Sequence, residues 1–278
     1  MSDANPIVEF MKLFRLWNGL IAVLGLLLGA AVSTGLTKFG SQPEELILGA
    51  MVVLLFVGAG NSLNDYFDLE TDRIAHPNRP LPKGTIQRRS ALISSAAMFV
   101  GCVLLSLFIN WLSFMIVILA ILIMVVYELK MKSRGLMGNV LIALLVSALF
   151  EFSGSVVGFP ENTLVLATLS GLATLGREIV KDIEDMKGDM SRMTLPKMIG
   201  ARKAGYVALV PTFMAVGLSP IPYLMEQLTH YYLLTVMIAD ALFVYGALIQ
   251  FQNPTRGQKI FKGAMIVALI AFALGVRP

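Results

Sequence analysis

Two segments of the sequence carry acidic and amide side chains at intervals of three or four residues. The first segment contains Asn61, Asn64, Asp65, Asp68 and Asp72. The second segment contains Glu178, Asp182, Asp185 and Asp189. On an α-helix this spacing places each set on one face, because residues three and four apart point in nearly the same direction. A helix face made of carboxylates and amides cannot lie against lipid, so each segment is a candidate site.

The two acidic faces predict a magnesium site. Clustered carboxylates raise each other's pKa unless a cation lies among them. Mg²⁺ prefers hard oxygen ligands and commonly binds through one or two carboxylates together with phosphate oxygens of a substrate. Two acidic faces that meet across a cavity would therefore bind a diphosphate. The alternative is that both segments are solvated helix ends, paired with neighbouring Arg and Lys side chains.

The sequence disfavours other common metal sites. Cys102 is the only cysteine and lies in an apolar stretch, which rules out an intramolecular disulfide and makes a cysteine-based metal site implausible. His76 and His230 are the only histidines, too few for a multi-histidine cluster. Any bound metal is therefore expected to have oxygen ligands.

The elements that carry the acidic faces are predicted to be transmembrane helices. Of 278 residues, 56% are hydrophobic and 14% are charged, and one span takes about 20 mostly apolar residues. Apolar windows lie near residues 14–34, 46–68, 88–109, 112–129, 138–157, 163–183, 202–219, 230–250 and 260–277. We therefore expect an all-α, polytopic membrane bundle of nine transmembrane helices. The sequence has no short-period repeat or long linker, so residues 1–278 are expected to form a single domain.

The distribution of basic residues supports nine spans over eight. Asn110 and Trp111 form only a short break in the apolar sequence around them. The alternative is therefore eight spans, with the third and fourth spans merged into one. With nine spans and a cytoplasmic N-terminus, only Lys38 and Arg277 of the 22 Lys and Arg residues fall outside, as the positive-inside rule requires. Both acidic segments then lie at the cytoplasmic side of a cell membrane, and the C-terminus lies outside. Because the basic residues border apolar helices, no nucleic-acid partner is expected.

Two stretches resemble the signatures of the UbiA superfamily of intramembrane prenyltransferases. The first is Asn64-Asp65-x-x-Asp68-x-x-x-Asp72, followed by Arg73 and by His76-Pro77-x-Arg79-Pro80-Leu81-Pro82-x-Gly84. The second is Lys181-Asp182-x-x-Asp185-x-x-Gly188-Asp189, followed by Arg192 and Thr194-Leu195-Pro196. The resemblance covers the whole chain, and it implies nine transmembrane helices around a central cavity.

The resemblance also implies roles for the matched residues. The ligands of Mg²⁺ ions that bridge the diphosphate of an isoprenoid donor would be Asn64, Asp68, Asp72, Asp182, Asp185 and Asp189. Phosphate oxygens would be bound by Arg79, Lys83 and Lys130. The alternative for each of the three is that it acts only as a topology signal. The remaining residues expected at the substrate site are Arg15, Asn18, Asn61, Asp65, Glu178 and Lys181.

Two shorter stretches indicate a branch of the family. Residues 176–185 and the opening Arg15-Leu-Trp-Asn18-Gly19 resemble the members that act in archaeal ether-lipid synthesis. That resemblance implies transfer of a geranylgeranyl group from its diphosphate to the free hydroxyl of geranylgeranylglyceryl phosphate, a lipid phosphate acceptor met by Arg15 and Asn18. Prenylation of an aromatic quinone or tetrapyrrole precursor is the alternative. A cation-coupled transporter is less well supported, because we find no Gly/Pro-broken helix pair in matching positions.

Two further acidic residues lie well inside predicted spans. Glu151 and Asp240 occur among apolar residues, where an ionisable group is costly and often functional. Each is explained equally well by a place in the acceptor pocket or by hydrogen bonding between helices.

Overall fold

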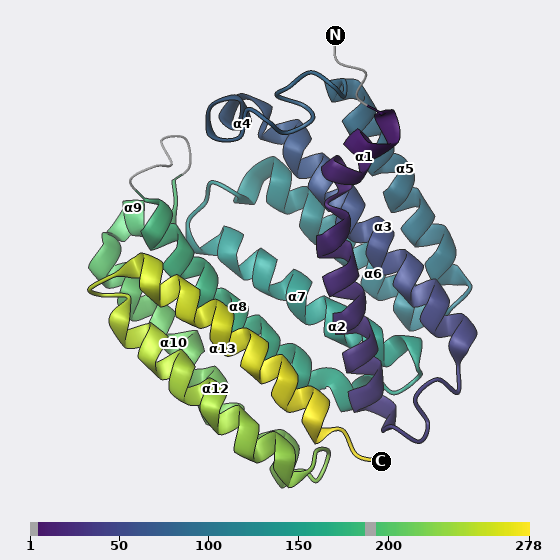
Figure 1. Ribbon diagram of the computed structural model, residues 1–278, viewed down its shortest axis with the longest axis vertical. Helices are drawn as coiled ribbons and strands as arrows, with labels where there is room; N and C mark the ends of the chain where they lie inside the picture. Colours follow the sequence, from purple (N-terminus) through teal and green to yellow (C-terminus); the bar gives the residue numbers. More distant parts are fainter. Residues whose placement is uncertain (1–4, 187–192) are drawn as a thin grey trace. The chain divides into compact units, whose positions relative to one another are not determined.

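A computed structural model of the chain describes residues 5–186 and 193–278. Within these ranges, nine helices are long and apolar enough to cross a membrane (Figure 1). They are α2 (Leu16–Thr34), α3 (Pro43–Phe67), α5 (Arg88–Leu107), α6 (Trp111–Val126) with the π-helical turn η1 (Tyr127–Met131), α7 (Leu136–Val156), α8 (Leu164–Asp185) with the 3₁₀ turn η2 (Pro160–Thr163), α10 (Ala201–Leu218), α12 (His230–Ile249) and α13 (Pro254–Gly275). The predicted all-helical, nine-span fold is confirmed.

Four short helices lie outside the predicted windows. They are α1 (Pro6–Phe14), α4 (Leu69–Ala75), α9 (Leu195–Ile199) and α11 (Ile221–Leu224). Periodicity over a long apolar window does not reveal such elements, because each has nine residues or fewer.

Asparagine caps determine two helix starts. The Asn110 side chain accepts a hydrogen bond from the Ser113 backbone N–H at 2.8 Å, so α6 begins at Trp111 as a separate helix and the eight-span alternative is wrong. The Asn253 side chain accepts from the Arg256 backbone N–H at 2.9 Å, and Pro254 occupies the first helical position. Because cap and proline together favour a helix start, α13 begins six residues before the apolar window that we predicted from residue 260.

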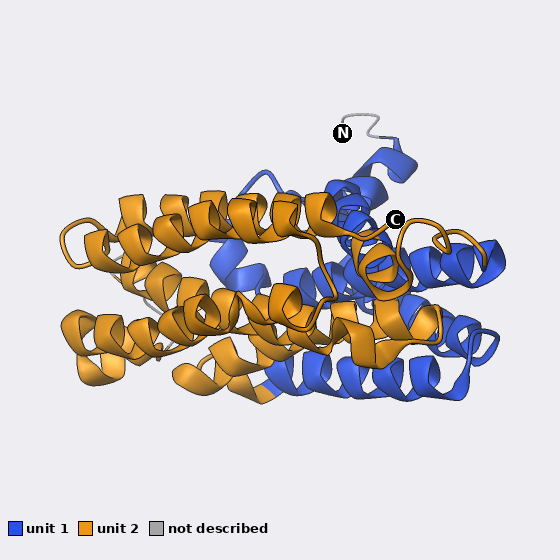
Figure 2. Cartoon of the chain, turned by 90° about the horizontal axis from the view of Figure 1, so that it is seen from below, with its two compact units in different colours: residues 1–27, 42–129 blue, residues 28–41, 130–278 orange. Residues whose placement is uncertain are grey.

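The chain divides into two compact units (Figure 2). Unit 1 comprises residues 1–27 and 42–129, and unit 2 comprises residues 28–41 and 130–278. The expectation of a single domain stays a prediction. In unit 1, Ala59, Leu63 and Phe99 form a core between α3, α5 and α6. A second apolar cluster joins α1 and α4 to the segment before α5, through Leu13, Leu69, Leu81, Ile86 and Ala91.

In unit 2, α8 is held by close packing on several sides. Ile179 and Val180 are fully buried against Phe243 and Phe261 of α12 and α13. Near the middle of α8, a Cβ atom added at Gly171 would overlap the Ser147 hydroxyl of α7. This close approach sets the register of α7 against α8, and so positions the acidic C-terminal end of α8.

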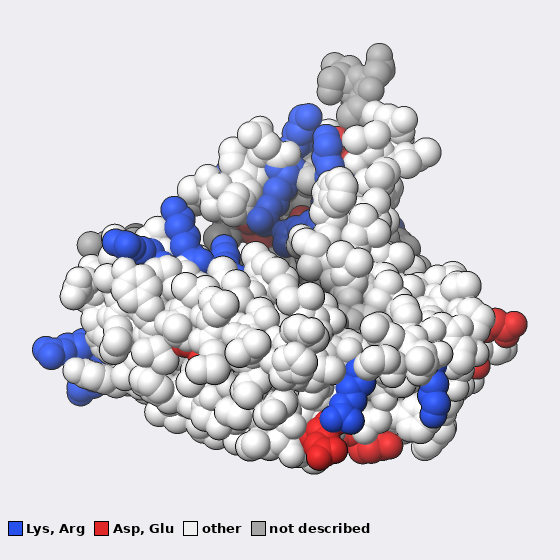
Figure 3. Space-filling model, turned by 60° about the horizontal axis from the view of Figure 1, so that its bottom comes forward, with Lys and Arg blue, Asp and Glu red and all other residues white. Residues whose placement is uncertain are grey.

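Large apolar side chains point outward along the spans. Among the most exposed are Leu24, Phe108, Trp111, Leu234 and Ile266. On the face drawn in Figure 3, uncharged side chains cover most of the surface, and Lys, Arg, Asp and Glu form separate small groups. An exposed apolar surface of this kind is stable against lipid and not against water.

Candidate active site

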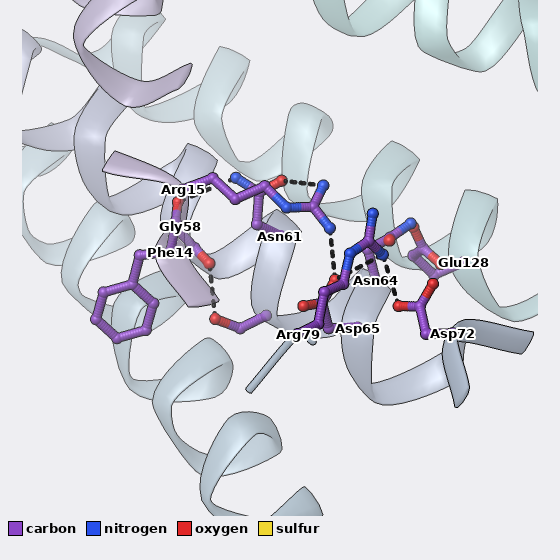
Figure 4. Close-up of polar contacts among 10 residues, drawn as sticks. Phe14, Arg15, Gly58, Asn61, Asn64, Asp65, Asp72, Arg79 and Glu128 are labelled. Carbon is purple, nitrogen blue, oxygen red and sulfur yellow. Dashed lines mark hydrogen bonds and ion pairs between the residues drawn. The ribbon is translucent and has the colours of Figure 1, made fainter. Parts of the chain in front are cut away.

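The first acidic segment is divided between two helices. We expected one continuous helix to carry residues 61–72, and that expectation was wrong: α3 ends at Phe67, and α4 begins at Leu69 after a turn at Asp68. Arg79 nevertheless joins the two parts (Figure 4). Its Nη1 lies 2.6 Å from Asp72 Oδ2 and 3.7 Å from Asp65 Oδ1. The carboxylates on either side of the break therefore share one guanidinium.

A second guanidinium, from the N-terminal helices, reaches one of these carboxylates, that of Asp65. Arg15 lies between α1 and α2 with φ 50° and ψ 59°, in the left-handed region. Its Nη2 donates to Asp65 Oδ1 at 2.6 Å, and its Nη1 donates to Asn61 Oδ1 at 3.2 Å. The Asn61 amide nitrogen donates to the Phe14 carbonyl at 3.1 Å. Asn61 thus uses both ends of its amide to hold the bend at Arg15. Asn18, which was also expected at the substrate site, is exposed on α2.

As an alternative to metal binding, the acidic side chains were expected to pair with neighbouring Arg and Lys residues. The contacts with arginine agree with that expectation. Asp65 and Asp72 are buried, with exposures of 2% and 4%, and both face arginine. The positive charge compensates carboxylates that would otherwise be costly to bury. These ion pairs neutralise two members of the acidic face.

Asn64 contacts a residue that sequence reasoning missed. Its Nδ2 donates to Glu128 Oε1 at 2.9 Å, and Glu128 is 7% exposed in η1 at the end of the fourth span. Glu128 is an ionisable residue inside the predicted window 112–129, and that position is the signal that could have identified it.

The second acidic segment lies at the C-terminal end of α8 in unit 2. Asn139 of α7 donates through Nδ2 to Asp182 Oδ2 at 2.9 Å, a contact that sequence reasoning also missed. Glu178 is paired with Arg177, and its Oε2 lies 3.6 Å from Lys181 Nζ. Asp185 is the last residue of α8. Asp189 lies outside the described residues.

The expected phosphate-binding residues have different surroundings. Arg79 begins a compact turn, in which the Lys83 N–H donates to the Arg79 carbonyl at 2.9 Å and the Thr85 N–H donates to the Pro80 carbonyl at 3.0 Å. A cavity of about 360 Å³ in unit 1 lies beside this turn, lined by Lys12, Ala75, His76, Pro77, Asn78, Arg79 and Pro80. Lys83 and Lys130 are exposed.

The oxygen donors fit a hard cation. In the part of the chain that the structure describes, no three His, Cys, Asp or Glu side chains converge as a complete metal site. Mg²⁺ does not require one, because it usually retains waters and takes phosphate oxygens beside one or two protein ligands. Asn64 offers an amide oxygen, and Asp68 lies one helical turn further along the chain.

The acidic residues inside the spans have different environments. Asp240 accepts a hydrogen bond from the Ser219 hydroxyl at 2.6 Å, which supports the interhelical explanation. It also lines an apolar cavity of about 170 Å³. On α8 the cavity is lined by Leu166, Leu169 and Ala173, roughly on the opposite side of the helix from Asp182 at 100° per residue. One carboxylate oxygen of Glu151 is buried with no hydrogen-bond partner among the described residues.

The sequence matches a model of the UbiA prenyltransferase family over residues 15–272. The chain belongs to the UbiA prenyltransferase family. It is therefore a multi-pass membrane protein. The region of the UbiA match includes both acidic segments, Glu128 and Asn139.

Relatives within the UbiA family are similar over nearly the whole chain. Digeranylgeranylglyceryl phosphate synthase of Methanosarcina mazei is 38% identical over 96% of this chain and 98% of its own length. A solved structure of digeranylgeranylglyceryl phosphate synthase has a TM-score of 0.87 at 33% identity and covers 98% of this chain and 99% of that one. A UbiA homologue from Archaeoglobus fulgidus bound to GPP and Mg²⁺ has a TM-score of 0.68 at 15% identity, covering 96% and 97%. That last likeness is one of fold.

Proposed function

We propose that this chain transfers a geranylgeranyl group from geranylgeranyl diphosphate to the free hydroxyl of geranylgeranylglyceryl phosphate, releasing diphosphate, in archaeal ether-lipid synthesis. The observation that carries the reaction class is the polar site at the α3–α4 turn, where carboxylates, an amide and two arginines lie together. The observation that favours this branch over quinone or tetrapyrrole prenylation is the similarity, over nearly the whole chain, to relatives that bear that enzyme's name.

The donor diphosphate is assigned to the acidic faces. Bound magnesium would neutralise the charge that builds on the diphosphate as its carbon–oxygen bond breaks, held by Asn64, Asp68, Asp72, Asp182, Asp185 and Asp189. The magnesium ion in the Archaeoglobus fulgidus homologue supports this assignment by analogy of fold. Arg79 contacts its carboxylate partners through Nη1, and a guanidinium has five N–H donors. Arg79 therefore has donors for phosphate oxygens, and the exposed Lys83 and Lys130 add positive charge.

The acceptor phosphate is assigned to the cationic side of the same site. Arg15 is committed to Asp65 and Asn61, so it holds the bend between α1 and α2 and contributes charge at short range. The phosphate would enter the cavity beside Arg79, which Lys12 and His76 line. Asn18, Lys181 and Glu178 complete the proposed substrate contacts. The isoprenoid chains would lie among apolar helix faces around a central cavity, where exclusion of water protects an allylic cation from hydrolysis.

A product assay tests this function. Purified protein receives geranylgeranyl diphosphate and Mg²⁺ with geranylgeranylglyceryl phosphate, 4-hydroxybenzoate or dihydroxynaphthoate in turn. We expect a lipid ether product and stoichiometric diphosphate only with the glycerophosphate acceptor. A product formed only with an aromatic acceptor would favour the alternative branch, and no diphosphate release with any acceptor would favour a non-enzymatic role such as transport.

A further inference from the structure

The contact between Asn64 and Glu128 determines which end of the Asn64 amide faces the site. The Asn64 Nδ2 lies 2.9 Å from Glu128 Oε1. An ionised carboxylate only accepts hydrogen bonds, so the amide nitrogen must face Glu128 and the amide oxygen must point the other way. Among residues 5–186 and 193–278, the Asn64 oxygen accepts no hydrogen bond from another side chain or backbone N–H.

Asn61, one helical turn earlier on α3, provides an internal comparison. Its amide is engaged at both ends, because the nitrogen donates to the Phe14 carbonyl and the oxygen accepts from Arg15. The two asparagines therefore differ in chemistry although they share a helix face. The Asn61 oxygen accepts a hydrogen bond from Arg15, whereas the Asn64 amide contacts Glu128 through its nitrogen (Figure 4).

Glu128 is held by the packing of α6 against α3. Met124 of α6 packs on the apolar cluster that contains Ala59 and Leu63 of α3, and a Cβ atom at Gly60 would lie 2.8 Å from Met124 Cε, the flexible end of that side chain. Asn64 and Glu128 follow Gly60 and Met124 by four residues each, and the two helices thus run in the same direction with matched turns. The π-helical turn at Tyr127–Met131 begins here, and such turns re-aim side chains within a helix, frequently at functional sites. Glu128 is 7% exposed in this turn.

We propose that Glu128 is a positioning residue that presents the Asn64 amide oxygen to the divalent cation of the diphosphate site. The inference rests on the proposed function, because it assumes that a cation binds at the first acidic segment. Partners that orient metal ligands typically contribute 10- to 100-fold to metal affinity. Without the carboxylate, the Asn64 amide is free to rotate and to turn its nitrogen toward the cation, which would repel it.

The test measures cation binding without turnover. Mn²⁺ serves as the probe, with its affinity read by electron paramagnetic resonance in the presence of geranylgeranyl thiolodiphosphate, which resists ionisation. We expect Glu128→Ala to raise the Mn²⁺ dissociation constant roughly tenfold. Glu128→Gln should give an intermediate value, because its amide can accept from Asn64 in one orientation and donate to it in the other. Glu70→Ala removes a nearby exposed charge and serves as the matched control, with affinity close to that of the wild type.

Coupling to Asn64 separates positioning from general stabilisation. In an Asn64→Ala background, Glu128→Gln should no longer change the Mn²⁺ affinity. In an Asn64→Asp background the sign should reverse, because Glu128 now repels a carboxylate and Glu128→Gln relieves that repulsion. Both comparisons use protein whose elution volume in size-exclusion chromatography is unchanged. Glu128→Gln keeps the size and shape of the side chain, so it still provides the test if Glu128→Ala does not fold.

The outcomes distinguish this inference from the proposed function. Wild-type Mn²⁺ affinity in Glu128→Ala, or an effect of Glu128→Gln that is the same with and without Asn64, would overturn the positioning role even if the enzyme makes its lipid product. Failure of the wild type to form any prenylated product would overturn the proposed function, whatever the Mn²⁺ affinities are.

Discussion

The Arg15 guanidinium lies 2.6 Å from the Asp65 carboxylate, although 50 residues separate them in the chain. Arg15 is also one of two non-glycine residues with positive φ among those described. The left-handed region costs an L-residue roughly 1–2 kcal/mol. The bend between α1 and α2 is therefore maintained by the contacts of the Arg15 side chain with Asp65 and Asn61, and by the hydrogen bond from Asn61 to the Phe14 carbonyl. Strain of this kind commonly persists where surrounding contacts over-determine it.

This relationship predicts that two substitutions at one position will differ. Arg15→Ala removes the ion pair and keeps the backbone strain, whereas Arg15→Gly removes the ion pair and relieves the strain. Both should reduce stability, because Asp65 loses its closer partner. We expect the alanine variant to be less stable than the glycine variant by about 1 kcal/mol, measured by unfolding in mixed micelles. Equal stabilities would show that the backbone conformation is not retained in the variants.

The acidic faces are predicted to be required for turnover and not for folding. Asp68→Ala and Asp185→Ala should each lower kcat by about 10²-fold or more, because loss of several kcal/mol of charge stabilisation slows the reaction by that factor. Glu70→Ala is the control, since Glu70 is exposed and pairs with Arg73 at the surface. The measurement is diphosphate release by purified protein with an unchanged elution profile. Near-normal activity in either aspartate variant would contradict the proposed site.

Packing between α7 and α8 is predicted to depend on Gly171. Gly171→Ala should destabilise the protein by about 1–3 kcal/mol, because the new methyl group would overlap the Ser147 hydroxyl. The second substitution Ser147→Ala should restore part of that loss by removing the overlapping atom. Gly217→Ala is the matched control, because a Cβ at that position meets nothing within 4 Å. Thermal unfolding of the four proteins in detergent gives the comparison.

Docking of α1 is predicted to weaken in acid. Glu9 accepts hydrogen bonds from Lys12 Nζ and from the Thr85 hydroxyl, each at 2.6 Å. These bonds lower the pKa of Glu9, with the hydrogen bond from Lys12 as the largest cause and that from Thr85 next. A lowered pKa in the folded state means that the contribution is complete above the ordinary glutamate pKa and is lost as the pH falls through the lowered value.

A spin label on the exposed Val8→Cys position measures this effect. Its mobility should rise on acidification below about pH 4.3, reporting release of α1 from the turn that carries Thr85. In a Glu9→Gln background the label should be more mobile at neutral pH and insensitive to acid. Unchanged mobility of the label across this pH range in the parent protein would contradict the prediction.

The proposed orientation in the membrane can be tested by labelling introduced cysteines, because the wild type has a single cysteine. Cys102 is buried, so the wild type should resist labelling in intact cells. We expect Lys38→Cys to react with a membrane-impermeant maleimide in intact cells and Lys203→Cys to react only after permeabilisation, because both positions are exposed and lie on opposite sides in the proposed topology. The reverse pattern would place the acidic segments outside.

The spans were predictable because their signals are local. A membrane helix needs enough apolar residues in one window, and neither length nor apolarity depends on distant contacts. The start of α6 was also encoded locally, since the cap acts between Asn110 and Ser113. The acidic segments were recognised for the same reason: helical spacing is a property of neighbouring residues. Periodicity did not reveal the turn at Asp68, because the same pattern is compatible with a continuous helix and with two helices that meet at an angle.

The environment of each acidic residue depends instead on contacts between distant parts of the chain. Arg15 reaches Asp65 because a strained bend aims it there, and Glu128 meets Asn64 because side chains of α3 and α6 pack in one apolar cluster. Asn139 reaches Asp182 from the preceding span. Sequence spacing therefore identified which side chains lie on the acidic faces, whereas the packing of helices selected their partners, because hydrogen bonds and ion pairs require contact distances that spacing along the chain does not encode.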